Sequence, residues 1–201
     1  VRGDVGTRLG AEMSGGLLDL DGSCGDWAGA EMSGGLLRIR GDAGDALGAA
    51  YPGSRRGMRE GLIMVGGSAG DDVGLLMRRG VIGVKGAVGA GLGRSMIAGT
   101  IYACGPVGKL PGAGMKRGTL VLAGLGDDAE QYLSPTFGFA VRLTMPILGV
   151  YASLLRERGF VTPPSVSSGE IDRYNGDLAV DGRGEILVPA TPPTLRLISS
   201  E

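Results

Sequence analysis

The sequence contains no histidine, only two cysteines among 201 residues, and only 4% aromatic side chains. Without histidine, the chain lacks the commonest metal ligand and the commonest general base near neutral pH. Two cysteines cannot form the disulfide framework of a small secreted domain, so cysteine usage favours a reducing cytoplasm. We therefore expect a cytoplasmic protein with no catalytic residues and no metal-binding residues of its own.

Long apolar runs and strong net charge are also missing. No apolar stretch approaches the roughly 20 residues that a membrane-spanning helix needs, and the N-terminus has no signal-peptide pattern. The net charge of −1 provides no field that would attract nucleic acid or an anionic membrane. Neither nucleic acid nor a membrane is expected as a partner.

Glycine is abundant instead, with 41 residues, of which 33 lie before residue 125. One series of glycines falls at positions 3, 22, 41, 67, 86, 105 and 124, a spacing of 19 residues with one longer step. The longer step corresponds to a loop inserted at 51–57. A methionine recurs in the same phase, at Met13, Met32, Met58, Met77, Met96 and Met115. Because the glycines and the methionines recur at the same spacing and in the same phase, the sequence is that of a repeat protein.

Each repeat carries a short alternation of apolar residues, such as Leu18 and Leu20 or Ile82 and Val84. Period two predicts a half-buried strand, and glycine at this density would destabilise helices by ~1 kcal/mol per site. Strands at this interval predict a parallel β-helix, or solenoid, of 19-residue coils in which like residues stack. Residues 1–124 would form about six coils, with methionine and aliphatic side chains in the core.

The remaining residues, 125–201, are expected to form a C-terminal cap on this all-β solenoid. Pro146 and the arginines before Gly159 predict a short helix at about 146–158. Segment 162–170 is typical of a linker, 174–188 indicates two strands or a turn-rich segment, and 189–201 an extended tail. On the helix, one apolar face is expected to hold Ile147, Tyr151, Leu154 and Leu155.

The outward-facing strand positions become apolar towards the later repeats, at Met64, Tyr102 and Val121. We expect this wall to be covered by the C-terminal tail or by another subunit. The chain starts inside a repeat, so the N-terminal end of the stack is expected to be capped by preceding residues or by another chain.

Few residues suggest chemistry. Asp71 and Asp72 are adjacent and would point to opposite faces of a strand, which makes them a poor acid–base pair. The segment at 66–72 resembles a calcium-binding repeat but occurs once, so corner formation is the simpler interpretation. Cys24 and Cys104 lie about three coils apart, too far for a disulfide at ~4.8 Å per coil.

The glycine ladder, G-x-x-G-x-x-x-G, is similar to the GXGXG solenoid of glutamate synthase large subunits and of the C subunit of formylmethanofuran dehydrogenases. The ending YNGDLAVDGRGEIL, which follows a short helix, resembles the ending of that C subunit. Its bacterial counterpart is the C subunit of the formyltransferase/hydrolase complex of methylotrophs. Because 17 of the 20 basic residues are arginine, the composition favours this bacterial branch. The resemblance also implies a right-handed winding.

The resemblance implies a non-catalytic scaffold in one-carbon metabolism, in an obligate hetero-oligomer with the A, B and D subunits of the same complex. That complex moves a formyl group from formyl-tetrahydromethanopterin to a methanofuran-type carrier and releases formate at a metal in the A subunit. No cofactor is expected in this chain itself. One alternative is the C subunit of an archaeal tungsten or molybdenum formylmethanofuran dehydrogenase. Another is an enzyme, either a detached glutamate synthase-like domain or a hydrolase that uses carboxylates.

A further hypothesis is that the chain itself binds the carrier. Methanofuran-type carriers have glutamate-rich tails, and carboxylates suit an arginine-lined groove. The simpler alternative is a basic patch that contacts solvent or a partner chain. The candidate contacts are Arg55 and Arg56 in the inserted loop, with Arg59, Arg78 and Arg79.

Overall fold

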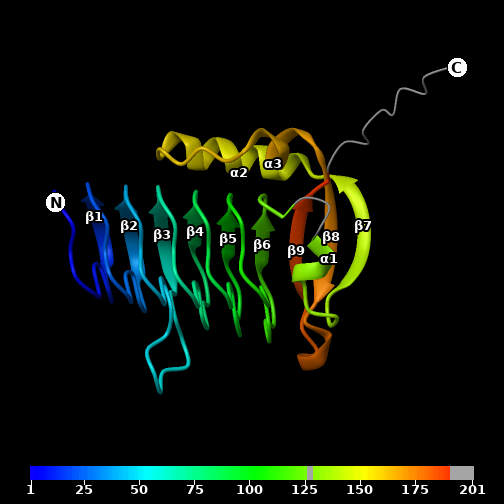
Figure 1. Cartoon of the computed structure of the whole chain (residues 1–201), viewed down its shortest axis with the longest axis horizontal. Coiled ribbons are helices and arrows are strands. Elements are labelled where there is room, and N and C mark those ends of the chain that lie inside the picture. Colours follow the sequence, from blue (N-terminus) through cyan, green and yellow to red (C-terminus); the bar gives the residue numbers. More distant parts are fainter. Residues whose placement is uncertain (126–128, 191–201) are drawn as a thin grey trace, which may run out of the picture.

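The computed structural model describes residues 1–125 and 129–190, and its strands form one nine-stranded mixed sheet with the order β1-β2-β3-β4-β5-β6-β9-β8-β7. Figure 1 shows the strands side by side along the long axis of the molecule. The predicted, mostly β architecture is confirmed. The first six strands occupy one repeat each: β1 (Ser14–Leu20), β2 (Ser33–Ile39), β3 (Glu60–Val65), β4 (Val81–Val84), β5 (Thr100–Ala103) and β6 (Thr119–Leu122).

The strands pair in parallel with equivalent residues opposite one another. Ile63 pairs with Ile82, Ile82 with Ile101, and Ile101 with Leu120. Side chains of the same type therefore stack along one line, as expected when a 19-residue repeat sets the register.

Outside the strands, a second line of single parallel bridges also joins the repeats, and it includes the pairs Ala69–Val88 and Val88–Val107. Carboxylates support this line from one repeat to the next. Asp45 Oδ1 accepts the backbone N–H of Asp71 at 2.8 Å, and Asp71 Oδ1 accepts that of Ala90 at 2.7 Å. Asp71 and Asp72 thus lie in a turn outside the strands, and the expectation that they would point to opposite faces of a strand is wrong.

The inner face of β1–β6 packs on a core formed by the methionine column and the aliphatic strand residues. Met32, Met58, Met77, Met96 and Met115 are all 0% exposed. Each methionine lies against a glycine of the following repeat: a Cβ at Gly80 would lie 2.8 Å from Met58 Cε. Because Gly80 also has a φ of +95°, only glycine fits the position without strain.

The outer face of the sheet carries a second core under α2 (Pro146–Glu157) and α3 (Pro164–Ser168). Met64, Tyr102 and Val121 pack there with Leu148, Leu155 and Phe160. The cover of this apolar wall is thus α2 and the segment that follows it, where the sequence indicated the tail or a partner chain. Gly83 makes room for Phe160, since a Cβ at Gly83 would lie 2.7 Å from Phe160 Cζ.

The C-terminal part extends the sheet. β9 (Gly184–Pro189) pairs in parallel with β6, and β8 (Glu170–Gly176) pairs antiparallel with both β9 and β7 (Gly138–Thr144). Short helical segments lie at α1 (Ala129–Tyr132) and η2 (Leu178–Val180).

Several of these elements differ from the sequence-based expectation. Segment 174–188, which was expected to form two strands or a turn-rich segment, contains the end of β8 and most of β9. Segment 162–170 was expected as a linker but contains α3, and β7 was not predicted. The extended tail at 189–201 falls almost wholly outside the described residues.

Truncation of a central methionine should test the packing. Met77→Ala is expected to lower the free energy of unfolding by ~2–5 kcal/mol, because it leaves a cavity between rigid repeats. Met13, at the end of the stack, is only partly buried, so Met13→Ala should cost clearly less. Denaturant titration of both variants measures the difference. Equal losses would contradict a core that is filled by the methionine column.

Candidate functional site

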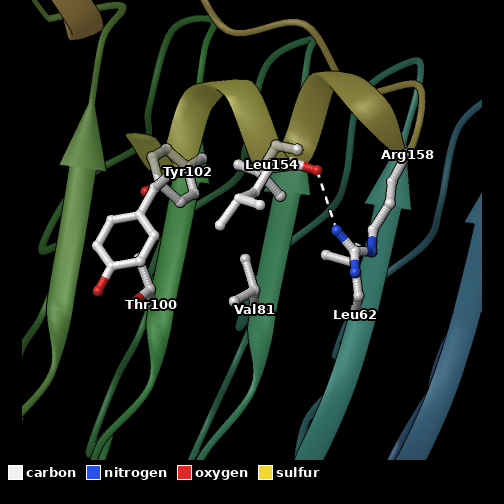
Figure 2. A pocket seen from close by; sticks show the side chains of 8 residues that line it. Leu62, Val81, Thr100, Tyr102, Leu154 and Arg158 are labelled. Carbon is white, nitrogen blue, oxygen red and sulfur yellow. Dashed lines mark hydrogen bonds between the residues drawn. The ribbon is translucent and has the colours of Figure 1, made fainter. Parts of the chain in front are cut away.

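A cavity of about 440 Å³ lies between α2 and the outer face of the sheet. Leu62, Val81 and Thr100 face it from three successive strands beneath the helix (Figure 2). The helix side contributes Leu154 and Leu155. Most of the lining is apolar, as is typical of a site that takes an apolar group. The remaining lining residues are Tyr102, Tyr151 and Arg158.

The polar groups of this cavity are hydroxyls and one guanidinium. Burial raises the pKa of Tyr102 to about 12, and Tyr151 contributes to the rise, so the Tyr102 hydroxyl stays protonated and acts as a hydrogen-bond donor. Arg158 Nη1 donates to the carbonyl oxygen of Leu154 at 3.1 Å, the bond drawn in Figure 2. The site can hold and orient an apolar group, but these residues form no nucleophile–base pair.

Helix α2 also has an exposed apolar side, part of which borders this cavity. Ile147, Val150, Tyr151 and Leu154 are between 44% and 54% exposed. The expected face held Ile147, Tyr151, Leu154 and Leu155, and the last three line this cavity together. Of the four, only Leu155 is buried, with Leu148 and Ala152. Sequence spacing missed this, since both sides of the helix are apolar. We call the four exposed residues the α2 stripe.

The end of α2 is fixed to the sheet by Arg38. Its Nη2 donates to the carbonyl oxygen of Arg158 at 2.7 Å, and its Nη1 lies 3.0 Å from Asp19 Oδ2. A cation at a helix C-terminus is favourable because the last carbonyl groups carry partial negative charge. The position of the α2 stripe is therefore held by a bond between residues 120 positions apart.

The five arginines predicted to contact a carrier are all exposed, and none lies in the cavity under α2. Arg55 and Arg56 belong to the loop before β3, which projects from the lower ends of the strands in Figure 1, whereas α2 crosses the upper ends. Arg59 Nη2 donates to the carbonyl oxygen of Glu31 at 3.4 Å. Arg78 and Arg79 precede β4. Neighbouring repeats thus bring Arg59 and Arg78 together, and a role in carrier binding stays a prediction.

A separate cavity of about 390 Å³ contains cations that the sequence did not single out. Lys116, Arg117 and Arg183 line it with Ile97, Val180 and Asp181. The sequence does contain one signal for Lys116, because this residue directly follows a methionine of the repeat, as Arg59 and Arg78 do.

The acidic and thiol candidates have structural roles. Asp72 Oδ1 accepts from Arg94 Nε at 2.8 Å. Cys24 and Cys104 are free thiols, and burial raises the pKa of each to about 11, so neither is a thiolate at neutral pH. Within residues 1–125 and 129–190, no group of three or more acidic or thiol side chains could hold a metal ion.

Comparison with known proteins shows a related solved structure that matches nearly the whole chain. No family model matches the sequence, and neither does any curated protein. Among solved structures, a chain of the formyltransferase/hydrolase complex (FhcABCD) from Methylorubrum extorquens, crystallised with methylofuran, superposes with a TM-score of 0.84. The two chains are 40% identical, and the match covers 94% of this chain and 70% of the other. The chain belongs to the family of this formyltransferase/hydrolase component. The family resemblance seen in the glycine ladder is thereby confirmed.

In this formyltransferase/hydrolase family member, the YNGD segment that carried the resemblance is a structural clamp. Asp177 Oδ2 accepts the backbone N–H of Gly114 at 2.9 Å, and Asp177 Oδ1 accepts that of Ala179 at 2.9 Å. The bond from Gly114 joins the turn after β8 to the last repeat, and the bond from Ala179 closes the turn itself.

Helices in the described ranges are all too short or too polar to cross a membrane.

The hydrogen bonds of Asp177 should make the free energy of unfolding depend on pH. Burial alone would raise the pKa of Asp177, but hydrogen bonds from Thr136, Gly114 and Ala179 outweigh it and lower the pKa below its ordinary value of 3.8. The stabilisation is therefore full above pH ~4 and is lost as the pH falls through the lowered pKa. Asp177→Asn should cost ~1–3 kcal/mol at neutral pH, because an amide satisfies these donors less well.

Thermal unfolding between pH 7 and pH 2 measures this dependence. The gap between wild type and Asp177→Asn should narrow in acid, whereas Asp21→Asn, a change at an exposed carboxylate, should follow wild type throughout. A gap of constant size at every pH would contradict the clamp.

Proposed function

We propose that this chain is the C subunit of a bacterial formyltransferase/hydrolase complex and acts there as a non-catalytic scaffold for the A, B and D subunits. The observation that carries the proposal is 40% identity over 94% of the chain to a member of such a complex. The same match favours a hydrolase complex over a tungsten or molybdenum dehydrogenase. An obligate hetero-oligomer in the cytoplasm is the corresponding form of the protein.

In the proposed complex, a formyl group passes from formyl-tetrahydromethanopterin to a methanofuran-type carrier and leaves as formate. A carrier of this class is supported by methylofuran in the related crystal structure. The metal belongs to the A subunit, and the chemistry takes place outside this chain. The described side chains agree with this division, because the acids among them form turns, caps and ion pairs.

The proposed scaffold is a right-handed parallel β-solenoid over residues 1–124, capped by residues 125–201. Two lines of parallel pairing between the repeats support the stacking of coils, one through the strands and one through the bridges outside them. The right-handed winding is taken from the family resemblance. Six strands at ~4.8 Å per repeat give a stack of ~29 Å whose length is fixed by backbone hydrogen bonds. Such a body keeps partners at a constant separation.

The α2 stripe is the proposed contact with a partner chain of the complex. It combines four exposed apolar side chains with the cavity beneath, whose rim includes Tyr151 and Leu154. Exposed apolar side chains beside a pocket are typical of the anchor region of an interface.

A charge in the centre of the stripe should break the assembly. Leu154→Asp is expected to weaken partner binding at least ~30-fold, because it buries an unpaired carboxylate at the contact. Ser153→Asp adds the same charge to the same helix outside the stripe and is the matched control. Native co-purification with tagged partner subunits measures the effect. Full recovery of every partner with Leu154→Asp, in a chain with unchanged circular dichroism, would refute the proposed contact.

A second candidate function is direct contact with the carrier through Arg55, Arg56, Arg59, Arg78 and Arg79. The carrier in the related crystal structure and the exposure of all five side chains favour it. In the assembled complex, Arg55→Glu with Arg56→Glu should weaken carrier binding about tenfold, because two attractions become repulsions. Calorimetry with the carrier measures this. Unchanged affinity in a complex that still assembles would remove these two residues from the carrier site.

A further inference from the structure

The cavity under α2 runs across three strands of the sheet. Leu62 pairs with Val81 and Val81 pairs with Thr100, so these residues form one row beneath the helix. At ~4.8 Å between neighbouring strands, the row is ~10 Å long. The volume of about 440 Å³ falls within the range of roughly 300–1,000 Å³ that is usual for small-molecule sites. The cavity is therefore large enough for an elongated molecule that lies across the strands.

One end of the cavity has a hydroxyl group without a partner in the protein. Tyr102 is only 3% exposed, and in the described part of the chain its hydroxyl forms no hydrogen bond. This hydroxyl is not among the fully enclosed polar atoms that lack a partner, which are Asp19 Oδ1, Arg38 Nε and Thr162 Oγ1. Since Tyr102 lines the cavity, its hydroxyl is open to that space. Buried tyrosine hydroxyls usually have a partner, so this one calls for a hydrogen-bond acceptor inside the cavity.

Arg158 lies at the other end of the cavity. In Figure 2 it lies near Leu62 on β3, whereas Tyr102 belongs to β5. The bond from Arg158 Nη1 to the carbonyl oxygen of Leu154 holds the guanidinium beside the cavity, and a guanidinium has further N–H donors to offer. Of the described residues that line the cavity, none is acidic. An anion beside Arg158 would therefore meet a cation and no like charge.

We infer that the cavity under α2 binds an amphipathic carboxylate, an unbranched apolar chain with a carboxylate at one end and a neutral oxygen at the other. The carboxylate would pair with Arg158, because a guanidinium matches it in charge and geometry. The apolar chain would lie along Leu62 and Val81, under Leu154. The neutral oxygen would accept from Tyr102, since the lining at that end offers hydroxyls and no cation.

A side chain of a partner is the alternative occupant, because Tyr151 and Leu154 also belong to the α2 stripe. It fits less well. One side chain that enters from the surface can reach the hydroxyl or the guanidinium, but these groups lie at opposite ends of a row ~10 Å long. The inference concerns this chain alone and does not depend on the proposed function.

Calorimetry of the full chain with ω-hydroxyoctanoate and with octanoate tests the inference. The two probes share the carboxylate and the carbon chain, and they differ only in the oxygen at the far end. ω-Hydroxyoctanoate should bind about fivefold more tightly, because it offers Tyr102 an acceptor. Tyr102→Phe should abolish this preference and leave the affinity for octanoate within about twofold of wild type.

The carboxylate end is tested by Arg158→Gln. This variant should bind both probes about tenfold more weakly, because it loses a charge-assisted hydrogen bond. Arg156→Gln removes the same charge from an exposed position on the same helix that does not line the cavity, and it should bind both probes as wild type does. Circular dichroism of each variant shows that the fold is retained.

The contrary results are equally clear. Failure of both probes to bind would overturn the inference, as would equal affinity of wild type for the two probes. Equal weakening by Arg156→Gln and Arg158→Gln would show a general charge effect and would also overturn it. If the chain binds the probes alone but not in its assembled complex, a partner occupies the cavity and the small-molecule site is refuted. Loss of partner subunits does not affect binding to the isolated chain, so failure of the proposed function remains distinguishable.

Discussion

The contact between each methionine and a glycine of the next repeat is the constraint on which the rest of the structure depends. Gly61, Gly80, Gly99 and Gly118 all have positive φ, and a Cβ at any of them would lie within 3 Å of the methionine Cε of the preceding repeat. A side chain there would be strained and would also collide with the core. The methionine and glycine columns are therefore one requirement, which sets the register of the strands that follow.

That register has consequences on the outer face. Because equivalent residues stack, a change in one column alters a whole surface, and the column that starts with Asp19 and Arg38 becomes apolar at Met64, Tyr102 and Val121. Phe160 fits over Gly83 in the same column. The helix that covers this wall is held at its far end by Arg38, a polar member of the column. Arg38, which holds the end of α2, and the apolar residues on which α2 packs therefore belong to the same stacked column.

The repeat half of the fold was predictable because every residue of the pattern recurs six times. The cap lacks this redundancy. In β7, six of seven residues are exposed. Its sequence does alternate, with Phe139, Val141 and Leu143 at every second position, but this single short signal was overlooked because no other segment repeats it. The two faces of α2 are both apolar, and spacing alone could not show which one packs on the sheet. Around the cavity beside the last repeat, Arg183 meets Lys116 only through the β6–β9 pairing, a long-range contact that no local pattern in the sequence predicts.

The placement of these surfaces bears on what a protein of this shape can do. The loop before β3, which carries Arg55 and Arg56, projects from the lower ends of the strands in Figure 1. Helix α2 crosses the upper ends. A partner on the α2 stripe would therefore leave this loop accessible. Because backbone hydrogen bonds join each repeat to the next, these two surfaces are held at a fixed separation.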